Sequence, residues 1–131
     1  MSRRILIVDD ESHIRHVLSL KLRNSGFIVD TAVDGEDALH QIAAMAPDLV
    51  ITDLQMPYVS GVELCRVLAE EPAHADIPVI ILTARGYALG EEAVGLTNVR
   101  QVVNKPFSPR TILEQVHRVL GTMFESQEQA A

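Results

Sequence analysis

Short apolar runs of four to six residues alternate along the chain with longer segments whose apolar residues follow helical spacing. Five of these runs predict strands, at Ile5–Val8, Ile28–Ala32, Leu49–Thr52, Ile77–Leu82 and Val99–Val103. Repeated alternation of this kind is typical of strand–helix units, which build a parallel sheet covered by helices on both faces. The pattern therefore predicts an α/β fold, with the very hydrophobic fourth run as the central strand.

The segments between the strands carry start and stop signals of helices. The first predicted helix ends at Asn24-Ser25-Gly26, where glycine favours a C-terminal stop. Three further helices are predicted to begin at N-cap residues, namely Asp34, Ser60 and Ser108. The segment Tyr87–Leu96 is the weakest predicted helix, because Gly90 and Gly95 each lower helix propensity by about 1 kcal/mol relative to alanine.

A chain of 131 residues with 47% hydrophobic content can bury one core but is too short for two ordinary domains. We expect one domain over residues 1–121 and a polar tail at 122–131. No apolar stretch reaches the roughly 18 residues of a membrane span, and the N-terminus turns acidic too soon for a secretory leader. A soluble, cytoplasmic protein is therefore expected, and the lone Cys65 fits a reducing compartment as a small core residue.

The formal net charge is −7, and the eleven Lys and Arg residues are scattered along the chain. Nucleic-acid surfaces need clustered basic residues, so we expect no direct contact with nucleic acid, and none with a membrane. The five histidines are dispersed as well, and solvated positions are predicted for all of them: His13, His16, His40, His74 and His117.

Charged side chains stand where the predicted strands end. Asp9 and Asp10 follow the first strand, Asp53 the third and Lys105 the fifth. Carboxyl ends of parallel strands open on one edge of a doubly wound sheet, where ligands bind. Two carboxylates about 4 Å apart repel by about 4 kcal/mol at an effective dielectric of about 20, so the cluster favours a bound cation. Oxygen ligands without Cys or His at ligand spacing indicate Mg²⁺, with Mn²⁺ as an alternative. Taken alone, the first acidic pair also fits a helix N-cap.

Four motifs occur in order along the chain: ILIVDD, LVITDLQMP followed by Gly61, VIILTA and VNKPF. Each is short, but their order and spacing together resemble the receiver domain of two-component response regulators over residues 4–121, in particular the stand-alone type of the chemotaxis switch. The resemblance implies a flavodoxin-like, doubly wound (βα)5 fold with a parallel five-stranded sheet in the order 2-1-3-4-5. It also implies a domain that accepts a phosphoryl group and then switches a partner-binding surface.

The resemblance makes Asp53 the expected phosphoryl acceptor. It makes Asp9, Asp10, a carboxylate oxygen of Asp53 and the backbone carbonyl of Gln55 the expected ligands of Mg²⁺. Such a role is physically sensible, because an attacking aspartate needs its own charge and that of the phosphate offset together, which the cation and Lys105 would do. Phosphoryl transfer needs mainly positioning and electrostatic stabilisation, so no separate general base is required. We therefore expect a signalling protein, not a conventional enzyme, that catalyses its own phosphorylation and dephosphorylation.

Further roles concern the phosphoryl group after transfer. The resemblance implies that Thr83 and Lys105 bind it, and that a cis bond before Pro106 aims the lysine inward. Ala84 leaves its backbone N–H open to a phosphate oxygen, although a small residue is also ordinary at a strand end. Arg85 stands at a position that borders the phosphoryl group in this family, and we expect it to modulate the lifetime of phospho-Asp53; an exposed loop arginine is the alternative interpretation.

Two positions depart from the family pattern. Val102, three residues before Lys105, stands where many receivers have Tyr or Phe, whose ring moves on activation. An aromatic switch is therefore not expected here, unless Tyr87 substitutes for it. Asn98 stands where the family usually has glycine, and we expect a positive φ there, which asparagine tolerates.

The expected phosphodonor is a sensor histidine kinase or a histidine phosphotransfer protein. A downstream protein target is expected to bind through residues of about 86–121, with the domain a monomer or a phosphorylation-dependent dimer. Three alternatives also account for parts of the pattern: a relay intermediate, a receiver-like interaction module that takes no phosphate, and an aspartyl-nucleophile phosphatase. The last requires a D-x-D-x-T run after the first strand, where this chain has DDESH.

Overall fold

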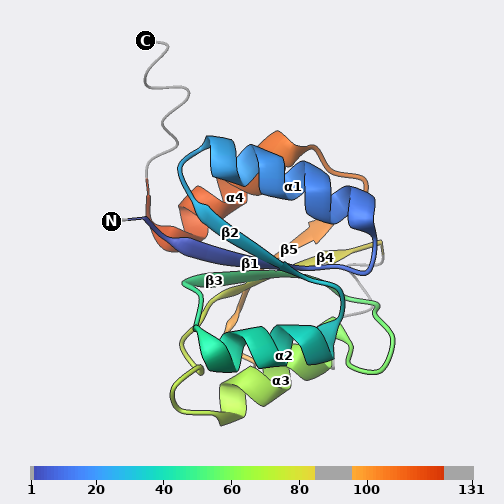
Figure 1. Ribbon diagram of the computed structural model, residues 1–131, viewed down its shortest axis with the longest axis vertical. Coiled ribbons are helices and arrows are strands. Elements are labelled where there is room, and N and C mark those ends of the chain that lie inside the picture. Colours follow the sequence, from blue (N-terminus) through green and yellow to red (C-terminus); the bar gives the residue numbers. More distant parts are fainter. Residues whose placement is uncertain (1, 85–95, 123–131) are drawn as a thin grey trace.

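The computed structural model describes residues 2–84 and 96–122. Its five strands form one parallel sheet in the order β2-β1-β3-β4-β5, as predicted (Figure 1). They are β1 (Arg4–Val8), β2 (Ile28–Ala32), β3 (Leu49–Asp53), β4 (Val79–Thr83) and β5 (Val99–Asn104). Four helices lie in the described residues: α1 (Ser12–Asn24), α2 (Gly35–Ala44), α3 (Gly61–Glu70) and α4 (Pro109–Leu120). The helix predicted at Tyr87–Leu96 falls largely outside the described residues.

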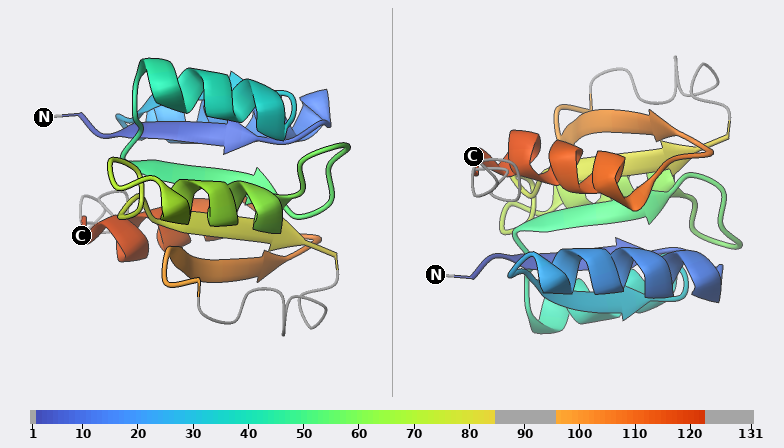
Figure 2. Two further views of the ribbon diagram at one scale, coloured as in Figure 1. Left: turned by 90° about the horizontal axis from the view of Figure 1, so that it is seen from below. Right: turned by 90° about the horizontal axis from the view of Figure 1, so that it is seen from above.

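The sheet is covered on both faces, with α1 and α4 on one side and α2 and α3 on the other (Figures 1 and 2). Alternate residues of each strand feed two separate cores. Leu6, Val50 and Ile81 pack toward α2 and α3, whereas Ile7, Ile51 and Ile80 pack toward α1 and α4. This arrangement explains the unbroken hydrophobic runs, because every residue of β3 and β4 is buried.

The predicted helix caps are present. The side chains of Asp34, Ser60 and Ser108 each accept a hydrogen bond from the backbone N–H three residues later, and Pro109 occupies the first turn of α4. At the end of α1, Gly26 has a φ of +98°. The three caps fix where α2, α3 and α4 start, and Gly26 marks where α1 ends.

Two predictions about the strands were wrong in detail. The middle strand is β3, and β4 lies between β3 and β5. The long apolar run of β4 reflects burial on both faces, which β3 shares, and does not report position in the sheet. The strand also begins at Val79 rather than Ile77, since Pro78 has no N–H to continue the ladder.

Asn98 and His117 also differ from expectation. The predicted positive φ at Asn98 is wrong, because Tyr58 is the only described non-glycine residue with a positive φ. The Asn98 side-chain Nδ2 instead donates to the Cys65 carbonyl at 2.9 Å, which connects the segment before β5 to α3.

His117 is buried, not solvated as predicted. Its ring lies against Phe27 at a centroid distance of 5.5 Å, and its Nδ1 is 2.6 Å from Thr122 Oγ1.

The edge strand β2 has side chains bound to its outer carbonyl groups. Ile28 N donates to Arg3 O, and Ala32 O accepts from Asp9 N. The backbone N–H and C=O groups of the even-numbered residues of β2 therefore point toward β1, and those of the odd-numbered residues point outward. The outward carbonyl of Val29 accepts from Arg23 Nη2 of α1, and that of Thr31 accepts from Gln41 Nε2 of α2, both at 2.8 Å. Both flanking helices therefore bind this edge.

Cys65 is buried and free, as expected for a core residue, and burial raises the pKa of its thiol to about 12. Within the described residues, no helix has the length and apolar character that crossing a membrane requires.

Candidate metal and phosphoryl site

The charged residues at the strand ends meet at the carboxyl edge of the sheet. Asp9 and Asp10 follow β1, Asp53 and Thr83 are the last residues of β3 and β4, and Lys105 follows β5. A cleft of about 300 Å³ opens at this edge. It is lined by Asp10, Glu11, Asp53, Leu54, Gln55, Thr83, Ala84 and Lys105. The parallel register therefore brings together residues that are up to 96 positions apart in the sequence, from 9 to 105.

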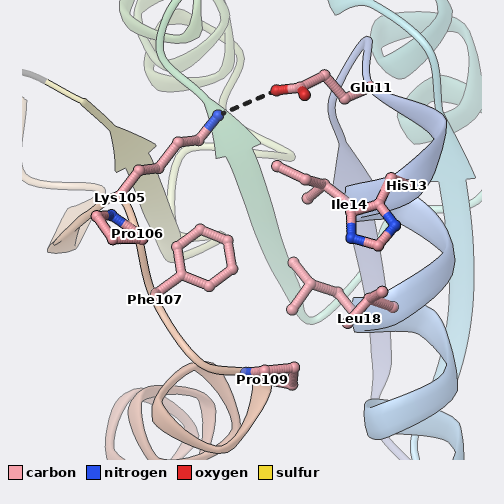
Figure 3. Close-up of a pocket in the computed structure, with 9 residues that line it drawn as sticks. Glu11, His13, Ile14, Leu18, Lys105, Pro106, Phe107 and Pro109 are labelled. Atoms are coloured by element: carbon pink, nitrogen blue, oxygen red, sulfur yellow. Dashed lines mark ion pairs between the residues drawn. The ribbon is translucent and has the colours of Figure 1, made fainter.

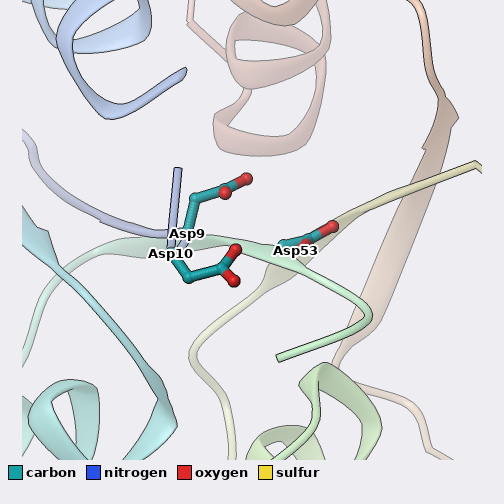
Figure 4. A group of neighbouring side chains, drawn as sticks. All are labelled: Asp9, Asp10 and Asp53. Atoms are coloured by element: carbon teal, nitrogen blue, oxygen red, sulfur yellow. The ribbon is translucent and has the colours of Figure 1, made fainter. Parts of the chain in front are cut away.

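Three carboxylates form the acidic part of the site (Figure 4). One oxygen from each of Asp9, Asp10 and Asp53 lies within 4.8 Å of the others. Asp9 is fully buried and Asp53 is 6% exposed, whereas Asp10 is exposed. Asp9 Oδ1 accepts from the Glu11 backbone N–H at 2.9 Å, but Asp9 Oδ2 is buried and makes no hydrogen bond within the described part of the chain.

This arrangement fits a divalent cation with oxygen ligands. A buried carboxylate oxygen without a hydrogen bond is costly, and a cation would satisfy it. Three acidic side chains at this separation supply the hard oxygen ligands that Mg²⁺ prefers, and the exposed Asp10 leaves one side open to water. The donor set therefore supports a metal site, without by itself distinguishing Mg²⁺ from Mn²⁺.

Burial and repulsion from neighbouring carboxylates disfavour negative charge on Asp9 and Asp53. Burial is the largest influence on Asp9 and raises its pKa to about 6, with repulsion from Asp53 acting in the same direction. Burial also raises the pKa of Asp53, against the lowering effect of its hydrogen bond to Lys105. Without a bound cation, Asp9 and Asp53 are thus harder to ionise than ordinary aspartates.

Among the described residues, Lys105 supplies positive charge to the acidic cluster. Its Nζ lies 3.1 Å from Asp53 Oδ1, 3.7 Å from Glu11 Oε1 and 3.9 Å from Asp9 Oδ2. Burial acts to lower the pKa of the ammonium, but its hydrogen bond to Asp53 and the surrounding carboxylates outweigh burial and raise it. The backbone N–H of Lys105 donates to Thr83 O at 2.8 Å, and the Lys105–Pro106 bond is cis, the isomer that the resemblance implied.

Glycine at position 61 lets the loop after β3 return close to the site. A Cβ on Gly61 would lie 2.5 Å from Asp53 O, and its N–H donates to Leu54 O at 2.8 Å. The backbone of Asp53 and Leu54 is thereby packed against the start of α3. Gln55, the expected carbonyl ligand, is exposed in this loop and lines the cleft.

The predicted site residues separate into three groups. Thr83, Ala84 and Gln55 line the cleft with the acids and the lysine. Val102 lies on β5 with 38% of its surface exposed and is not among the described residues that line the cleft. Arg85 lies outside the described residues, so its modulating role stays a prediction.

Glu11 belongs to the site but was missed from the sequence. It lines the cleft and forms an ion pair with Lys105. A third acid directly after Asp9-Asp10 was the signal that could have revealed it. Glu11 and Lys105 also border a second cavity of about 400 Å³, between α1 and the segment after β5, where His13, Ile14 and Phe107 line the walls (Figure 3).

The fold and site define a class: a doubly wound α/β protein whose carboxyl edge holds an acidic cluster that could bind a metal ion, beside a lysine. The chain matches the response regulator receiver domain family over residues 5–117, and it belongs to that family. It is therefore a phosphoacceptor signalling module. Receiver domains of this family accept phosphate from histidine kinases.

Curated relatives include transcriptional regulators. The chain is 36% identical over 121 residues to the alkaline phosphatase synthesis transcriptional regulatory protein PhoP of Bacillus subtilis (strain 168), covering 92% of this chain and 49% of that protein. It is 38% identical over 122 residues to the phosphate regulon transcriptional regulatory protein PhoB of Escherichia coli (strain K12), covering 92% and 52%. The chain thus spans about half the length of these relatives.

Solved structures of other response regulators are similar to this chain in fold and sequence. The chemotaxis response regulator CheY4 of Vibrio cholerae has a TM-score of 0.84 and 29% identity, covering 91% of this chain and 99% of that one. The response regulator TrrA of Thermotoga maritima has a TM-score of 0.76 and 34% identity, covering 88% and 97%. That structure was solved in complex with Mg²⁺-BeF.

Proposed function

We propose that Asp53 accepts the phosphoryl group from a phosphohistidine and that Asp9, Asp10, Asp53 and the Gln55 carbonyl hold Mg²⁺ beside it. The observation that carries this proposal is the acidic cluster, in which one oxygen of each of Asp9, Asp10 and Asp53 lies within 4.8 Å of the others and the Lys105 ammonium lies 3.1 Å from Asp53 Oδ1. The Mg²⁺ complex of the similar TrrA structure supports the choice of ion. When bound, the cation would offset the negative charge of the attacking carboxylate and of the incoming phosphoryl group.

Several residues of the site would take part in phosphoryl transfer. A carboxylate oxygen of Asp53 attacks phosphorus, the P–N bond breaks, and its electron pair stays on the imidazole nitrogen of the donor. Lys105, 3.1 Å from Asp53 Oδ1 before transfer, can turn to the phosphoryl oxygens after it. The Thr83 hydroxyl and the Ala84 backbone N–H lie at the end of β4 in the same cleft and would donate to the remaining oxygens.

Dephosphorylation would use the same site. Water would attack phosphorus of phospho-Asp53, the P–O bond to the carboxylate would break, and inorganic phosphate and the free Asp53 carboxylate would be released. A bound cation and Lys105 would again offset charge, so the chain would catalyse both the gain and the loss of its phosphoryl group. The proposed setting is the cytoplasm. The proposed partners are a sensor histidine kinase or histidine phosphotransfer protein as donor and a downstream protein as target.

The test is incubation of the purified chain with acetyl phosphate and Mg²⁺, with intact mass measured before and after. We expect one phosphoryl adduct in the wild type, none in Asp53→Asn, and none after chelation of the cation. An adduct that persists in Asp53→Asn would move the acceptor to another residue. No adduct in the wild type, with acetyl phosphate or a histidine kinase as donor, would favour the alternative of an interaction module that takes no phosphate.

A further inference from the structure

The loop between β3 and α3 holds a residue in an unfavourable backbone conformation. Tyr58 has a φ of +68°, and the Val59 N–H donates to Pro57 O at 2.8 Å, which closes a three-residue γ-turn with Tyr58 at its centre. The form of this turn with a positive central φ is rare and strained, and bulky residues seldom adopt it. Glycine or asparagine would fit the same turn at lower cost.

The Tyr58 side chain is almost entirely exposed, so packing of its ring does not offset this strain. It is 96% exposed, the highest exposure of any large hydrophobic side chain in the described part of the chain. Its neighbours Leu54, Met56 and Val59 face inward and pack on the core between the sheet and helices α2 and α3. Strained residues of this kind persist where they have a function outside the fold.

The loop is also held firmly. A Cβ on Gly35, at the start of α2, would lie 2.6 Å from Val59 Cβ, so the loop packs directly on that helix. On its other side, Gly61 brings the loop against the backbone of Asp53. Tyr58 is therefore presented on a fixed support, and an anchor ordered in advance loses little entropy when a partner binds.

The place of this loop indicates what it contacts. It projects beyond the carboxyl ends of the strands (Figure 2), and Leu54 and Gln55 at its start line the acidic cleft. A protein that brings a phosphohistidine to Asp53 must approach this edge of the sheet. Tyrosine is among the residues that most often dominate protein interfaces, because its ring offers a large apolar area with a polar end.

We propose that Tyr58 is an anchor residue for the protein that carries the phosphohistidine. The inference rests on the proposed function, since it assumes transfer to Asp53. The partner surface would offer an apolar recess for the ring, next to the phosphohistidine. A small phosphodonor needs no such contact.

The test compares two classes of donor in Tyr58→Gly and Tyr58→Phe. The protein donors are the purified histidine kinases of the source organism, autophosphorylated and screened against the wild type. The small donor is acetyl phosphate. We expect Tyr58→Gly to slow transfer from the protein donor about tenfold or more at subsaturating concentration. Its phosphorylation by acetyl phosphate should stay within about twofold of the wild type, and its thermal midpoint should not fall, because glycine fits the turn.

Controls separate docking from general effects. Tyr58→Phe keeps the ring and should retain transfer within about threefold, and Met45→Ala removes a different exposed side chain, 57% exposed at the C-terminal end of α2. Wild-type rates of transfer from the kinase in Tyr58→Gly would overturn the proposal. So would an equal loss with both donors, or a wild type that takes phosphate from acetyl phosphate but from no kinase. Failure of the wild type with both donors would instead contradict the proposed function.

Discussion

The two ends of the sheet treat charge differently. At the amino end, a cleft of about 300 Å³ is bordered by Arg4 and Asp30, whose side chains pair at 2.7 Å, and Asp48 accepts from the Arg4 backbone N–H at 2.7 Å. At the carboxyl end, the buried carboxylates of Asp9 and Asp53 lie at a cleft of similar volume, where Lys105 is the only basic side chain among the described residues of the lining.

The difference lies in burial and balance, not in the size of the cleft. The Arg4–Asp30 pair is partly exposed, so water screens it and neither charge needs a further partner. Asp9 is fully buried, and one of its oxygens makes no hydrogen bond within the described residues. Its negative charge is therefore unfavourable unless a cation binds beside it. Excess buried charge thus distinguishes a site that binds something from a cleft that is only structural.

The largest effect expected from this comparison is at Asp53. Asp53→Asn removes the proposed nucleophile and should abolish the phosphoryl adduct, whereas Asp30→Asn at the amino end should leave its rate of formation within about twofold. The measurement is intact mass against time with acetyl phosphate and Mg²⁺. Equal rates in the two variants would mean that the clefts do not differ in function.

Lys105→Ala is expected to have the next largest effect. The ammonium 3.1 Å from Asp53 Oδ1 is positioned to stabilise charge as it develops on the phosphoryl oxygens, and loss of one such group typically slows the reaction about 100-fold or more. The rate of adduct formation at saturating Mg²⁺ tests this. Arg4→Ala is the matched control, because it removes a cation from the other end of the sheet.

Asp9→Asn should change stability in a way that depends on pH and on the cation. Because the folded-state pKa of Asp9 is raised to about 6, the folded protein holds the proton more tightly than the unfolded chain. The free energy of unfolding without Mg²⁺ should therefore fall as pH rises from about 4 to about 6, by on the order of 2 kcal/mol.

Asp9→Asn should flatten this dependence, stabilise the cation-free protein at pH 7, and weaken its stabilisation by Mg²⁺. Urea unfolding at several pH values, with and without the ion, measures all three effects. A wild type whose stability rises across this pH range would contradict the assignment.

The smallest effect is expected at the amino end. Arg4→Ala breaks a pair whose side chains are 27% and 46% exposed, so the free energy of unfolding should fall by less than about 1 kcal/mol, and less at high salt. Chemical denaturation at low and high ionic strength measures it. A loss of several kcal/mol would show that the Arg4–Asp30 pair at the amino end stabilises the fold far more than an exposed ion pair does.

Much of this molecule could be predicted because its signals are local. Apolar runs located the strands, Asp34, Ser60 and Ser108 located helix starts, and the rule that parallel strands share a carboxyl edge brought Asp53 and Lys105 together. Each of these inferences needs only neighbouring residues and the assumption of a parallel sheet.

What could not be predicted depends on packing between distant segments. His117 is buried because Phe27, 90 positions earlier in the sequence, lies against it, and Asn98 binds a carbonyl of α3 33 positions away. The role of Glu11 becomes visible only when Lys105 is placed beside it. Likewise, the strain at Tyr58 is a backbone property that residue type alone would have argued against.

The side chains bound to β2 have a consequence for how the molecule meets its own copies. An open edge strand is a template on which another chain can add a strand and begin to aggregate. Here, two outward carbonyls are already occupied, by Arg23 and by Gln41. An incoming strand would have to displace one side chain from each flanking helix before it could pair, so this edge of the sheet resists growth into a larger one.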